Sequence, residues 1–365
     1  MSEPVVLLDA ERRVTWSNSA AKNLFSTRIE GRDFGLFARQ PELLAAIADV
    51  QGDMAHRRTA EIITSQPQER QWMVVASRIP PQEETRIRAS GVARIGPPVV
   101  LLAFHDITHV KLVERMRADF VANASHELRT PLSSLLGFIE TLRGPARDDA
   151  AARERFLAIM EEEARRMVRL VDDLLSLSRI ESDTALPADA RADLGEVVAR
   201  VTGTLAPLAD EHDIRFVLEK RTDDTLVHGD SDQLVQMVSN LVENAIKYGG
   251  EKGSVTIRLE DRPAVTHANG PGENGSLLLE VIDEGPGIAP EHLPRLTERF
   301  YRVDTARSRA MGGTGLGLAI VKHIVRRHEG ELVIFSTPGV GTRVRITLPR
   351  MAATRTAKSP PRSEK

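Results

Sequence analysis

The chain contains 365 residues with a formal net charge of −3 at pH 7; 41% of the residues are hydrophobic and 28% are charged. This length is enough for two or three domains, and we expect three, each with its own core. The composition is ordinary for a globular protein of mixed α/β structure, and the charge gives no reason to expect binding to nucleic acid or membranes. The absence of cysteine excludes disulfides, thiolate catalysis and cysteine-ligated metals and is compatible with a reducing cytosol.

The first region, residues 1–109, has the pattern of a small sensor-type domain. The alternating runs VVLLD and RVTWS predict two strands around a polar turn, and a short helix follows over 18–25. Further strand-like runs at 61–64, 72–77 and 99–106 predict a five-stranded antiparallel sheet with helices on one side. The prolines and charges of 78–98 favour an irregular or hairpin excursion.

Residues 110–184 predict a helical hairpin. The pattern is helical over 110–143, the Gly144-Pro145 pair forces a turn, and a second helix follows over 151–181. Apolar residues of the second helix recur at helical spacing and form one stripe: Phe156, Met160, Met167, Leu170, Leu174 and Leu177. A single hairpin leaves much of this stripe in water, so we expect two hairpins to pair as a four-helix bundle in a homodimer.

Residues 185–350 alternate helices and strands and predict a second α/β domain. Helices are expected over 194–211, 230–248 and 315–328, and strands over 214–219, 254–260, 277–283, 331–336 and 343–348. The segment 262–276 is rich in Gly, Pro and Asn and predicts a surface loop, while the tail 351–365 is expected to be disordered.

No stretch approaches the roughly 18 consecutive apolar residues of a membrane span. The chain is therefore not expected to cross a membrane. We expect a cytoplasmic protein, placed at the inner face of the plasma membrane if an anchor lies upstream. The sequence leaves open whether such a segment exists.

The run SHELRTPL, residues 125–132, lies in the first long helix. Its helical phase places His126 away from the apolar face, so this side chain should face solvent. The adjacent Glu127 could accept a proton from the imidazole and leave a nucleophilic nitrogen. Thr130 lies one turn later on the same edge, and Pro131 favours a local bend. From this run alone, an exposed histidine without a chemical role is an equally good interpretation.

The run NLVENAIKY, residues 240–248, combines amide oxygens with a cation. Asn240 and Asn244 share one helix face, with Glu243 and Lys247 at its edge. Such a face suits Mg²⁺ together with phosphate, because the ion takes few protein oxygens. A polar helix face is more often simply solvated, and this alternative stays open.

The run DEGPGI, residues 283–288, directly follows an apolar strand. Its glycines permit a tight backbone beside a ligand, and an ionised Asp283 could accept a hydrogen bond from an exocyclic amine such as that of adenine. A turn that merely ends a strand uses the same residues.

The run GGTGLGL, residues 312–318, opens a helix. Its glycines let backbone N–H groups approach a phosphate, and the helix N-terminus favours negative charge. The run lacks the Gly-Lys-Ser/Thr end of a P-loop. The segment before it contains the Phe300-Tyr301 pair and predicts a mobile lid or an ordinary flexible loop. Its basic residues are Arg299, Arg302, Arg307 and Arg309.

Taken in order, these runs resemble the sequence boxes of the histidine kinases. SHELRTPL is similar to the H box, NLVENAIKY to the N box, DEGPGI to the first glycine box, ERFYRVD to the F box and GGTGLGL to the second glycine box. The resemblance, over residues 120–349, implies an ATP-dependent protein histidine kinase of a two-component system. It implies that His126 is the phosphoacceptor, Glu127 the general base, Asn244 a Mg²⁺ ligand and Asp283 the carboxylate that recognises adenine.

The resemblance also implies a larger nucleotide pocket drawn from the four downstream boxes. Its further residues are Asn240, Lys247, Tyr248, Gly285, Gly287, Ile288, Phe300, Arg302, Gly313, Thr314, Gly315, Leu316 and Gly317. The cofactors implied are ATP and Mg²⁺. The partner implied is the receiver domain of a response regulator, to which the phosphoryl group passes.

The fold implied is multidomain α+β. It comprises a PAS-like α/β sensor over 1–109, a dimeric helical hairpin for phosphotransfer over 110–184, and an α/β sandwich ATP-binding domain of the Bergerat type over 185–350. The run HDIT at 105–108 is similar to the motif that closes PAS domains. The phrases ADFVANASHELRTPL and GGTGLGLAIVKHIVRRH resemble the phosphate-regulon sensor kinases. A phosphatase activity in which Thr130 orients water is a further expectation.

Two rival functions follow from the same residues. One is an ATPase similar to chaperones or topoisomerases, in which no histidine is modified, and SHELRTPL on a bundle helix argues against it. The other is a ligand-binding sensor with an inactive kinase region, which the intact Asn244, Asp283 and Gly315 disfavour.

Overall fold

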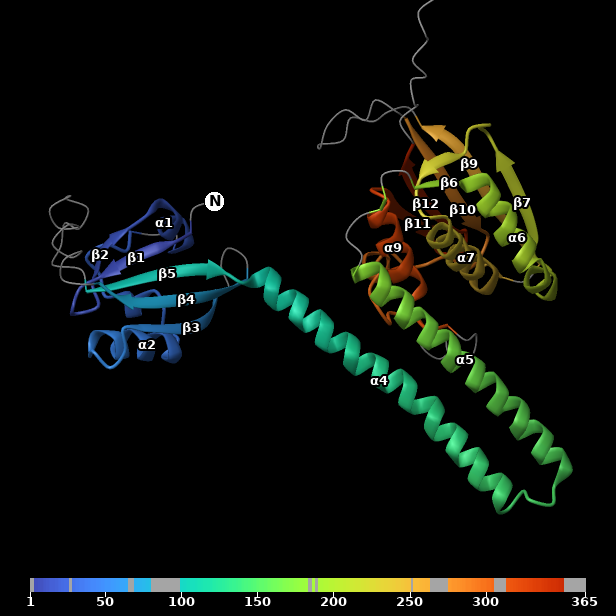
Figure 1. Ribbon diagram of the computed structural model, residues 1–365, viewed down its shortest axis with the longest axis horizontal. Helices are drawn as coiled ribbons and strands as arrows, with labels where there is room; N and C mark the ends of the chain where they lie inside the picture. Colours follow the sequence, from blue (N-terminus) through green and yellow to red (C-terminus); the bar gives the residue numbers. More distant parts are fainter. Residues whose placement is uncertain are drawn as a thin grey trace, which may run out of the picture. The chain divides into compact units, whose positions relative to one another are not determined.

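The computed structural model describes residues 3–25, 28–64, 69–79, 99–182, 186–187, 190–250, 252–262, 275–304 and 313–350. The chain forms two compact units, Met1–Ala122 and Asn123–Lys365 (Figure 1). The excursion, the insertion loop and the tail expected from the sequence lie almost wholly outside the described residues. Within the described ranges, no helix has the length and apolar character needed to span a bilayer.

A five-stranded antiparallel sheet in the order β2-β1-β5-β4-β3 forms the first unit. Its strands are β1 (Val5–Leu8), β2 (Val14–Ser17), β3 (Arg57–Thr64), β4 (Arg70–Arg78) and β5 (Val100–Asp106). The predicted sheet is therefore confirmed. An aromatic cluster fills its core, where the Phe104 ring meets Phe25 at 5.9 Å and Trp72 at 6.3 Å, both edge to face. Such pairs add to the stabilisation from burial alone.

The helices of this unit are α1 (Ser19–Phe25), a 3₁₀ turn η1 (Phe34–Leu36) and α2 (Pro41–Gln51). The sequence analysis predicted α1 but not α2. Proline occupies the first turn of α2, where its missing N–H costs nothing. The buried residues of α2 recur at helical spacing: Leu43, Ala46, Ile47 and Val50.

The long helix α4 (Thr108–Arg143) begins directly after β5 and is fixed to the sheet there. The Thr108 hydroxyl bonds to a carboxylate oxygen of Asp106 at 2.5 Å and accepts the backbone N–H of Gln71 at 2.9 Å. One turn later, Lys111 pairs with Glu61 of β3 at 3.0 Å. The start of α4 is therefore coupled to both β3 and β4.

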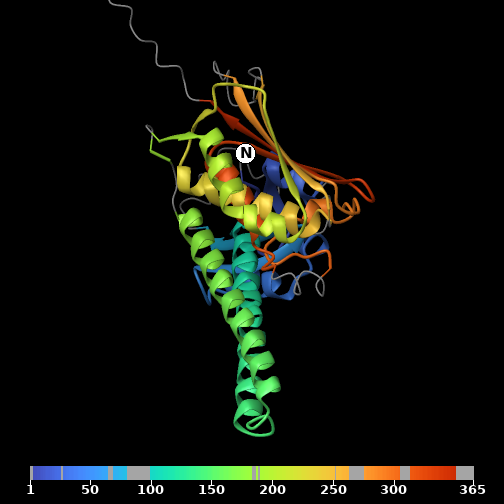
Figure 2. The same ribbon diagram turned by 90° about the vertical axis from the view of Figure 1, so that its right-hand side faces the viewer.

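The second long helix, α5 (Ala150–Ser182), completes the predicted hairpin with α4, and the two lie side by side in Figures 1 and 2. The Phe138 and Phe156 rings meet across the hairpin at 5.3 Å. α4 continues through Pro131 without ending. Leu170 and Leu177 of the predicted stripe are buried, whereas Leu132 on α4 and Val168 on α5 are 50% and 61% exposed. A single chain therefore leaves apolar surface on both helices in water.

The rest of the second unit is an α/β sandwich. Its five-stranded sheet has the order β11-β12-β10-β9-β7, with β7 and β9 parallel and the other pairs antiparallel. The strands are β7 (Arg215–Lys220), β9 (Ser254–Arg262), β10 (Ser276–Asp283), β11 (Glu331–Thr337) and β12 (Gly341–Pro349). The helices α6 (Leu194–Glu211), α7 (Ser231–Tyr248) and α9 (Gly317–Arg327) cover one face of the sheet (Figure 2).

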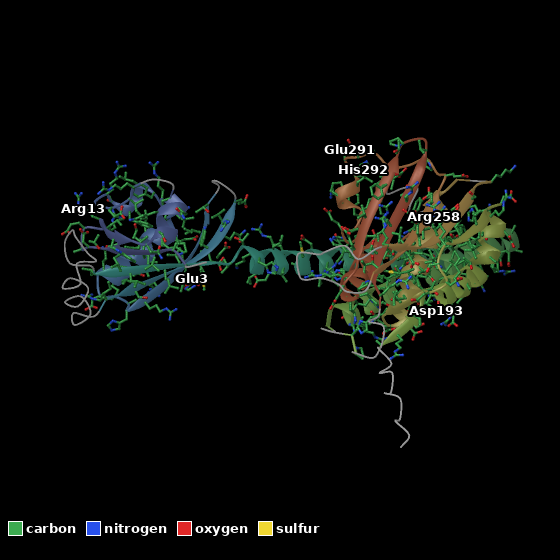
Figure 3. All side chains as sticks on the ribbon, turned by 90° about the horizontal axis from the view of Figure 1, so that it is seen from above. Glu3, Arg13, Asp193, Arg258, Glu291 and His292 are labelled. Atoms are coloured by element: carbon green, nitrogen blue, oxygen red, sulfur yellow. The ribbon has the colours of Figure 1, made fainter. Side chains whose placement is uncertain are left out.

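Two short strands that the sequence did not predict, β6 (Arg191–Asp193) and β8 (Leu226–His228), pair beside this sandwich. Asp193, labelled in Figure 3, ends β6 and caps α6 by accepting the backbone N–H groups of Gly195 and Glu196. The strand pair therefore fixes where α6 begins.

His328, which is 1% exposed, joins the end of α9 to the start of α7. Its Nε2 accepts the backbone N–H of Asp230 at 3.1 Å, so Nδ1 carries the proton and donates to the Ile324 carbonyl at 2.8 Å. Gly229 leaves room for the ring, because a Cβ there would lie 2.7 Å from it. Burial lowers the pKa of His328, with the Ile324 bond opposing the shift. A neutral imidazole thus holds together the two helices that carry most nucleotide-binding runs.

Stability of the second unit is expected to fall in mild acid because of this histidine. Above about pH 6.5 the ring is neutral in both the folded and unfolded states, and its contribution is complete. As the pH drops below that value, the unfolded chain binds the proton first, so folding loses free energy until the lower folded pKa is reached. Urea unfolding between pH 8 and pH 5 measures this loss. A His328→Gln variant should be less stable at pH 8 by about 2 kcal/mol and should show a smaller acid slope. An equal slope in both proteins would contradict the assignment.

Candidate functional site

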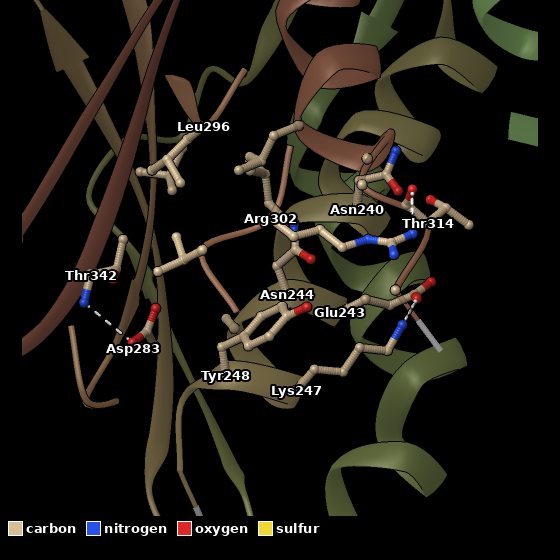
Figure 4. A pocket seen from close by; sticks show the side chains of 18 of the residues that line it. Asn240, Glu243, Asn244, Lys247, Tyr248, Asp283, Leu296, Arg302, Thr314 and Thr342 are labelled. Atoms are coloured by element: carbon tan, nitrogen blue, oxygen red, sulfur yellow. Dashed lines mark hydrogen bonds and ion pairs between the residues drawn. The ribbon is translucent and has the colours of Figure 1, made fainter. Parts of the chain in front are cut away.

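A cavity of about 490 Å³ opens between α7, the end of β10 and the start of α9 (Figure 4). Helix α7 is amphipathic: its buried face packs into the sandwich, and its polar face lines the cavity with Asn240, Asn244, Lys247 and Tyr248. Asp230 caps α7 by accepting two backbone N–H groups and so fixes its start. The volume is in the range of small-molecule and cofactor sites.

The polar face of α7 contains both a fixed cation and an unused donor. Lys247 pairs with Glu243 at 2.8 Å, one helical turn away. The Asn240 amide nitrogen is buried and has no hydrogen-bond acceptor within the described residues. Because such a donor is costly when it is unsatisfied, this wall favours a ligand with acceptor oxygens.

Asp283 lies at the far end of the cavity, where β10 ends. Its Oδ1 accepts the backbone N–H groups of Gly285 at 3.0 Å and Thr342 at 3.2 Å, which fixes the carboxyl group (Figure 4). Burial raises the pKa of Asp283, and these two bonds oppose the shift. Leu296 and Ile334 belong to the apolar lining nearby. A half-buried acceptor among apolar walls suits a flat base that carries an amine.

Gly287 allows the chain to turn closely beside this end of the cavity. Its φ is +69°, and an added Cβ would lie 2.1 Å from the Thr337 carbonyl oxygen. Both the left-handed conformation and the contact exclude a side chain. The following residue, Ile288, donates its N–H to Ser336 at 2.9 Å and so keeps the turn against β11.

The opposite end of the cavity is closed by Arg302 and the segment that opens α9. Arg302, whose side chain is 4% exposed, donates to the Thr314 carbonyl at 2.9 Å and to Glu127 at 3.0 Å. Its Nε is buried without an acceptor among the described residues. Gly315 has φ +73° and lies against Phe300, which donates its N–H to the Gly315 carbonyl at 2.8 Å. The N-terminus of α9 and a guanidinium at this end suit phosphate.

His126 is exposed on α4, as its helical phase predicted. It does not line the cavity. Its neighbour Glu127 is 18% exposed in its side chain and pairs with both Arg302 and Arg166 of α5, the latter at 3.3 Å. The Thr130 hydroxyl donates to the His126 carbonyl at 3.2 Å. The cavity therefore reaches the helical turn of His126 through the Arg302–Glu127 pair.

Most residues predicted for the nucleotide pocket line this one cavity. Gly285, Phe300 and Leu316 do not line it; they support its wall through backbone contacts. Gly312, Arg307 and Arg309 lie outside the described residues.

Sequence reasoning missed three lining residues on α5. These residues are Arg169, Asp172 and Asp173. The Thr314 hydroxyl donates to Asp173 at 2.7 Å. Their spacing alone carried no signal, because the contact joins segments 141 residues apart.

An exposed histidine on a helical hairpin, next to a nucleotide-sized cavity in an α/β sandwich, defines a class of phosphotransfer proteins. Residues 116–183 match the His Kinase A (phospho-acceptor) domain, and residues 229–352 match the histidine kinase-, DNA gyrase B- and HSP90-like ATPases.

Curated relatives agree with these matches. The phosphate regulon sensor protein PhoR of Pseudomonas aeruginosa is 36% identical over 94% of this chain and 71% of its own length. The sensor histidine kinase WalK of Bacillus subtilis is 34% identical over 68% of this chain and 39% of its own length. The chain belongs to the sensor histidine kinase family and is an ATP-dependent protein histidine kinase.

One solved structure resembles nearly the whole chain. The histidine kinase ThkA, in a complex with the response regulator protein TrrA, has a TM-score of 0.50 and 19% identity over 96% of both chains. At this identity the likeness supports the fold alone.

Proposed function

We propose that His126 accepts the γ-phosphoryl group of ATP and passes it to an aspartate of a response regulator. The observation that carries the proposal is the Arg302–Glu127 pair, at 3.0 Å, which joins the phosphate end of the cavity to the residue beside His126. The regulator seen with ThkA belongs to that protein, and its presence there supports a receiver domain as the partner here.

In the proposed reaction an imidazole nitrogen of His126 attacks the γ-phosphorus. The N–P bond forms as the bond to the bridging oxygen breaks, ADP leaves, and Glu127 takes the ring proton. In the resting arrangement the guanidinium groups of Arg166 and Arg302 both pair with the Glu127 carboxylate, so its oxygens are already engaged. Transfer therefore requires these pairs to loosen and Arg302 to turn toward the phosphates.

The residues of the cavity fit an ATP·Mg²⁺ complex. No group of three or more His, Cys, Asp or Glu side chains arranged for a metal occurs in the described part of the chain. Mg²⁺ needs few protein ligands when phosphate and water complete its shell, so the amide oxygen of Asn244 is sufficient. The ion would neutralise charge on the phosphates. The buried donors of Asn240 and Arg302 would gain phosphate oxygens as acceptors.

The exposed apolar residues of the hairpin support a homodimer. They occur on both helices: Leu132, Leu136 and Ile139 on α4, and Leu157, Val168, Val171 and Leu175 on α5. Pairing two hairpins as a four-helix bundle would bury them.

We assign residues 1–109 to a PAS-like sensor, 110–184 to dimerisation and phosphotransfer, 185–350 to ATP binding and 351–365 to a tail. The likeness to the phosphate regulon sensor protein PhoR supports phosphate-regulon sensing. In this scheme the Lys111–Glu61 pair, at 3.0 Å, couples the sensor sheet to the signalling helix.

The proposal also includes dephosphorylation of the regulator, with Thr130 orienting the attacking water. Thr130→Ala should slow loss of phosphate from the phosphorylated regulator about ten-fold and change autophosphorylation less than two-fold. The reason is that the exposed hydroxyl lies one turn from His126 but does not line the nucleotide cavity. Thr130→Ser is the matched control, and equal losses of both activities would refute the separate role.

Incubation with γ-labelled ATP tests the proposal as a whole. The label should bind covalently to the chain, resist base, leave in acid and move to a purified receiver domain. Release of free phosphate without a labelled protein would instead identify a simple ATPase.

A further inference from the structure

Asp173 of α5 contacts the glycine-rich segment that closes the nucleotide cavity. Its Oδ2 accepts the Thr314 hydroxyl at 2.7 Å, and the same hydroxyl accepts the backbone N–H of Leu316. The Thr314 carbonyl accepts Arg302, which also reaches Glu127. One threonine therefore joins this segment to both helices of the hairpin.

Among the described residues, some charged side chains at this end of the cavity form ion pairs and others do not. Lys247 is paired with Glu243 at 2.8 Å, and Arg302 is paired with Glu127 at 3.0 Å. Asp173 differs, because within the described ranges it bonds to a neutral hydroxyl and forms no ion pair. Asp172 also lines the cavity.

The surroundings of Asp173 already disfavour negative charge. Burial raises the pKa of Asp173. The Thr314 hydroxyl and the Lys247 ammonium oppose this shift, while the Glu243 and Asp172 carboxylates add to it. Phosphates entering the same cavity would place further negative charge near this carboxylate. Like charges in a partly buried site repel more strongly than in water.

We propose that Asp173 makes nucleotide binding and the contact between the hairpin and the glycine-rich segment oppose each other. While the Asp173 carboxylate accepts the Thr314 hydroxyl, it repels the phosphates, and bound ATP in turn weakens the Asp173–Thr314 contact. This inference rests on the proposed function only for its consequence. By loosening the contact, ATP would free the glycine-rich segment and Arg302, and with it Glu127, before phosphoryl transfer. Asp173 thus acts as a positioning residue that couples the state of the cavity to the hairpin.

The proposal predicts that removing the Asp173 charge changes the affinity of the full chain for a nucleotide in proportion to the nucleotide's negative charge. Asparagine has the shape of aspartate and can still accept the Thr314 hydroxyl, so Asp173→Asn removes the charge but retains the contact. We expect this variant to bind ATP about five-fold more tightly without Mg²⁺, ADP less so and adenosine unchanged. The gain should shrink at high salt, because ions screen the repulsion. Competition with a fluorescent nucleotide, in EDTA and in Mg²⁺, measures each affinity.

Two matched variants on α5 complete the design. Glu161→Gln removes an exposed carboxylate that pairs with Arg165 and does not line the cavity, so it should leave all affinities unchanged. Asp172→Asn should give a smaller gain than Asp173→Asn, because Asp172 lines the cavity without contacting Thr314.

Two results would overturn the proposal. Weaker ATP binding by Asp173→Asn only in Mg²⁺ would make Asp173 a helper of the metal. An equal change for adenosine would point to a structural effect. Because the affinities in EDTA are measured without phosphoryl transfer, they stay informative even if His126 proves not to be the acceptor.

Discussion

Replacing His126 with glutamine should abolish transfer of label from γ-labelled ATP to the chain, to below about 1% of the wild-type rate, because the variant lacks the imidazole nitrogen proposed to accept the phosphoryl group. ATP affinity should stay within about two-fold, since the His126 side chain is exposed and does not line the cavity. Glutamine suits the exposed helix position, so folding should persist. Acid-labile radiolabel and a separate nucleotide titration measure the two effects.

His109 offers a matched control on the same helix. It is exposed, one residue after Thr108, and belongs to the first unit, so His109→Gln should retain full labelling. If His126→Gln kept the acid-labile label, the acceptor would lie elsewhere and the proposed mechanism would be wrong. If it lost ATP binding as well, His126 would have a structural role.

Periodicity predicted the long elements well. The observed α4, α5, α6 and α7 begin and end within about two residues of the ranges expected, because long amphipathic patterns leave few alternatives. Helix α2, by contrast, was not predicted from the sequence. Its buried residues repeat at helical spacing behind Pro41, so the signal was present in the sequence and was overlooked.

Strands β6 and β8 carried too little local signal to be predicted. They have three residues each and exist because they pair with one another, beside the Asp193 cap of α6. Strands this short are defined by tertiary contacts rather than by periodicity.

The candidate site likewise has a part that local sequence patterns predicted and a part that depends on contacts between distant residues. The motifs correctly grouped the polar face of α7, Asp283 and most of the glycines, which line one cavity in the structure. This was possible because each lies at the end of a predicted strand or on one face of a predicted helix. The contact of Arg302 with Glu127 joins residues 175 positions apart, and no local pattern indicates which side chains meet across that distance. The contact between the hairpin and the ATP-binding domain could therefore be identified only from the structure.

Replacing Asp283 with asparagine should weaken ATP binding about 30- to 100-fold, since a half-buried charged acceptor is exchanged for a neutral amide. The amide oxygen can still accept the N–H groups of Gly285 and Thr342, so the fold of the loop should persist. Its NH₂ group would then face the exocyclic amine of adenine, and two donors cannot bond to one another. Autophosphorylation should fall in parallel at low ATP and recover partly at high ATP, because the phosphate end of the cavity is unchanged.

Glu284 provides the control for this loss. It is the adjacent carboxylate, is exposed, and accepts the Ser254 N–H from outside the cavity, so Glu284→Gln should bind ATP normally. Competition by adenosine and by inorganic triphosphate separates the two ends of the site. Asp283→Asn should weaken adenosine about as much as ATP and leave triphosphate unaffected. The opposite pattern would place the base away from β10 and would reverse the orientation of the nucleotide in the cavity.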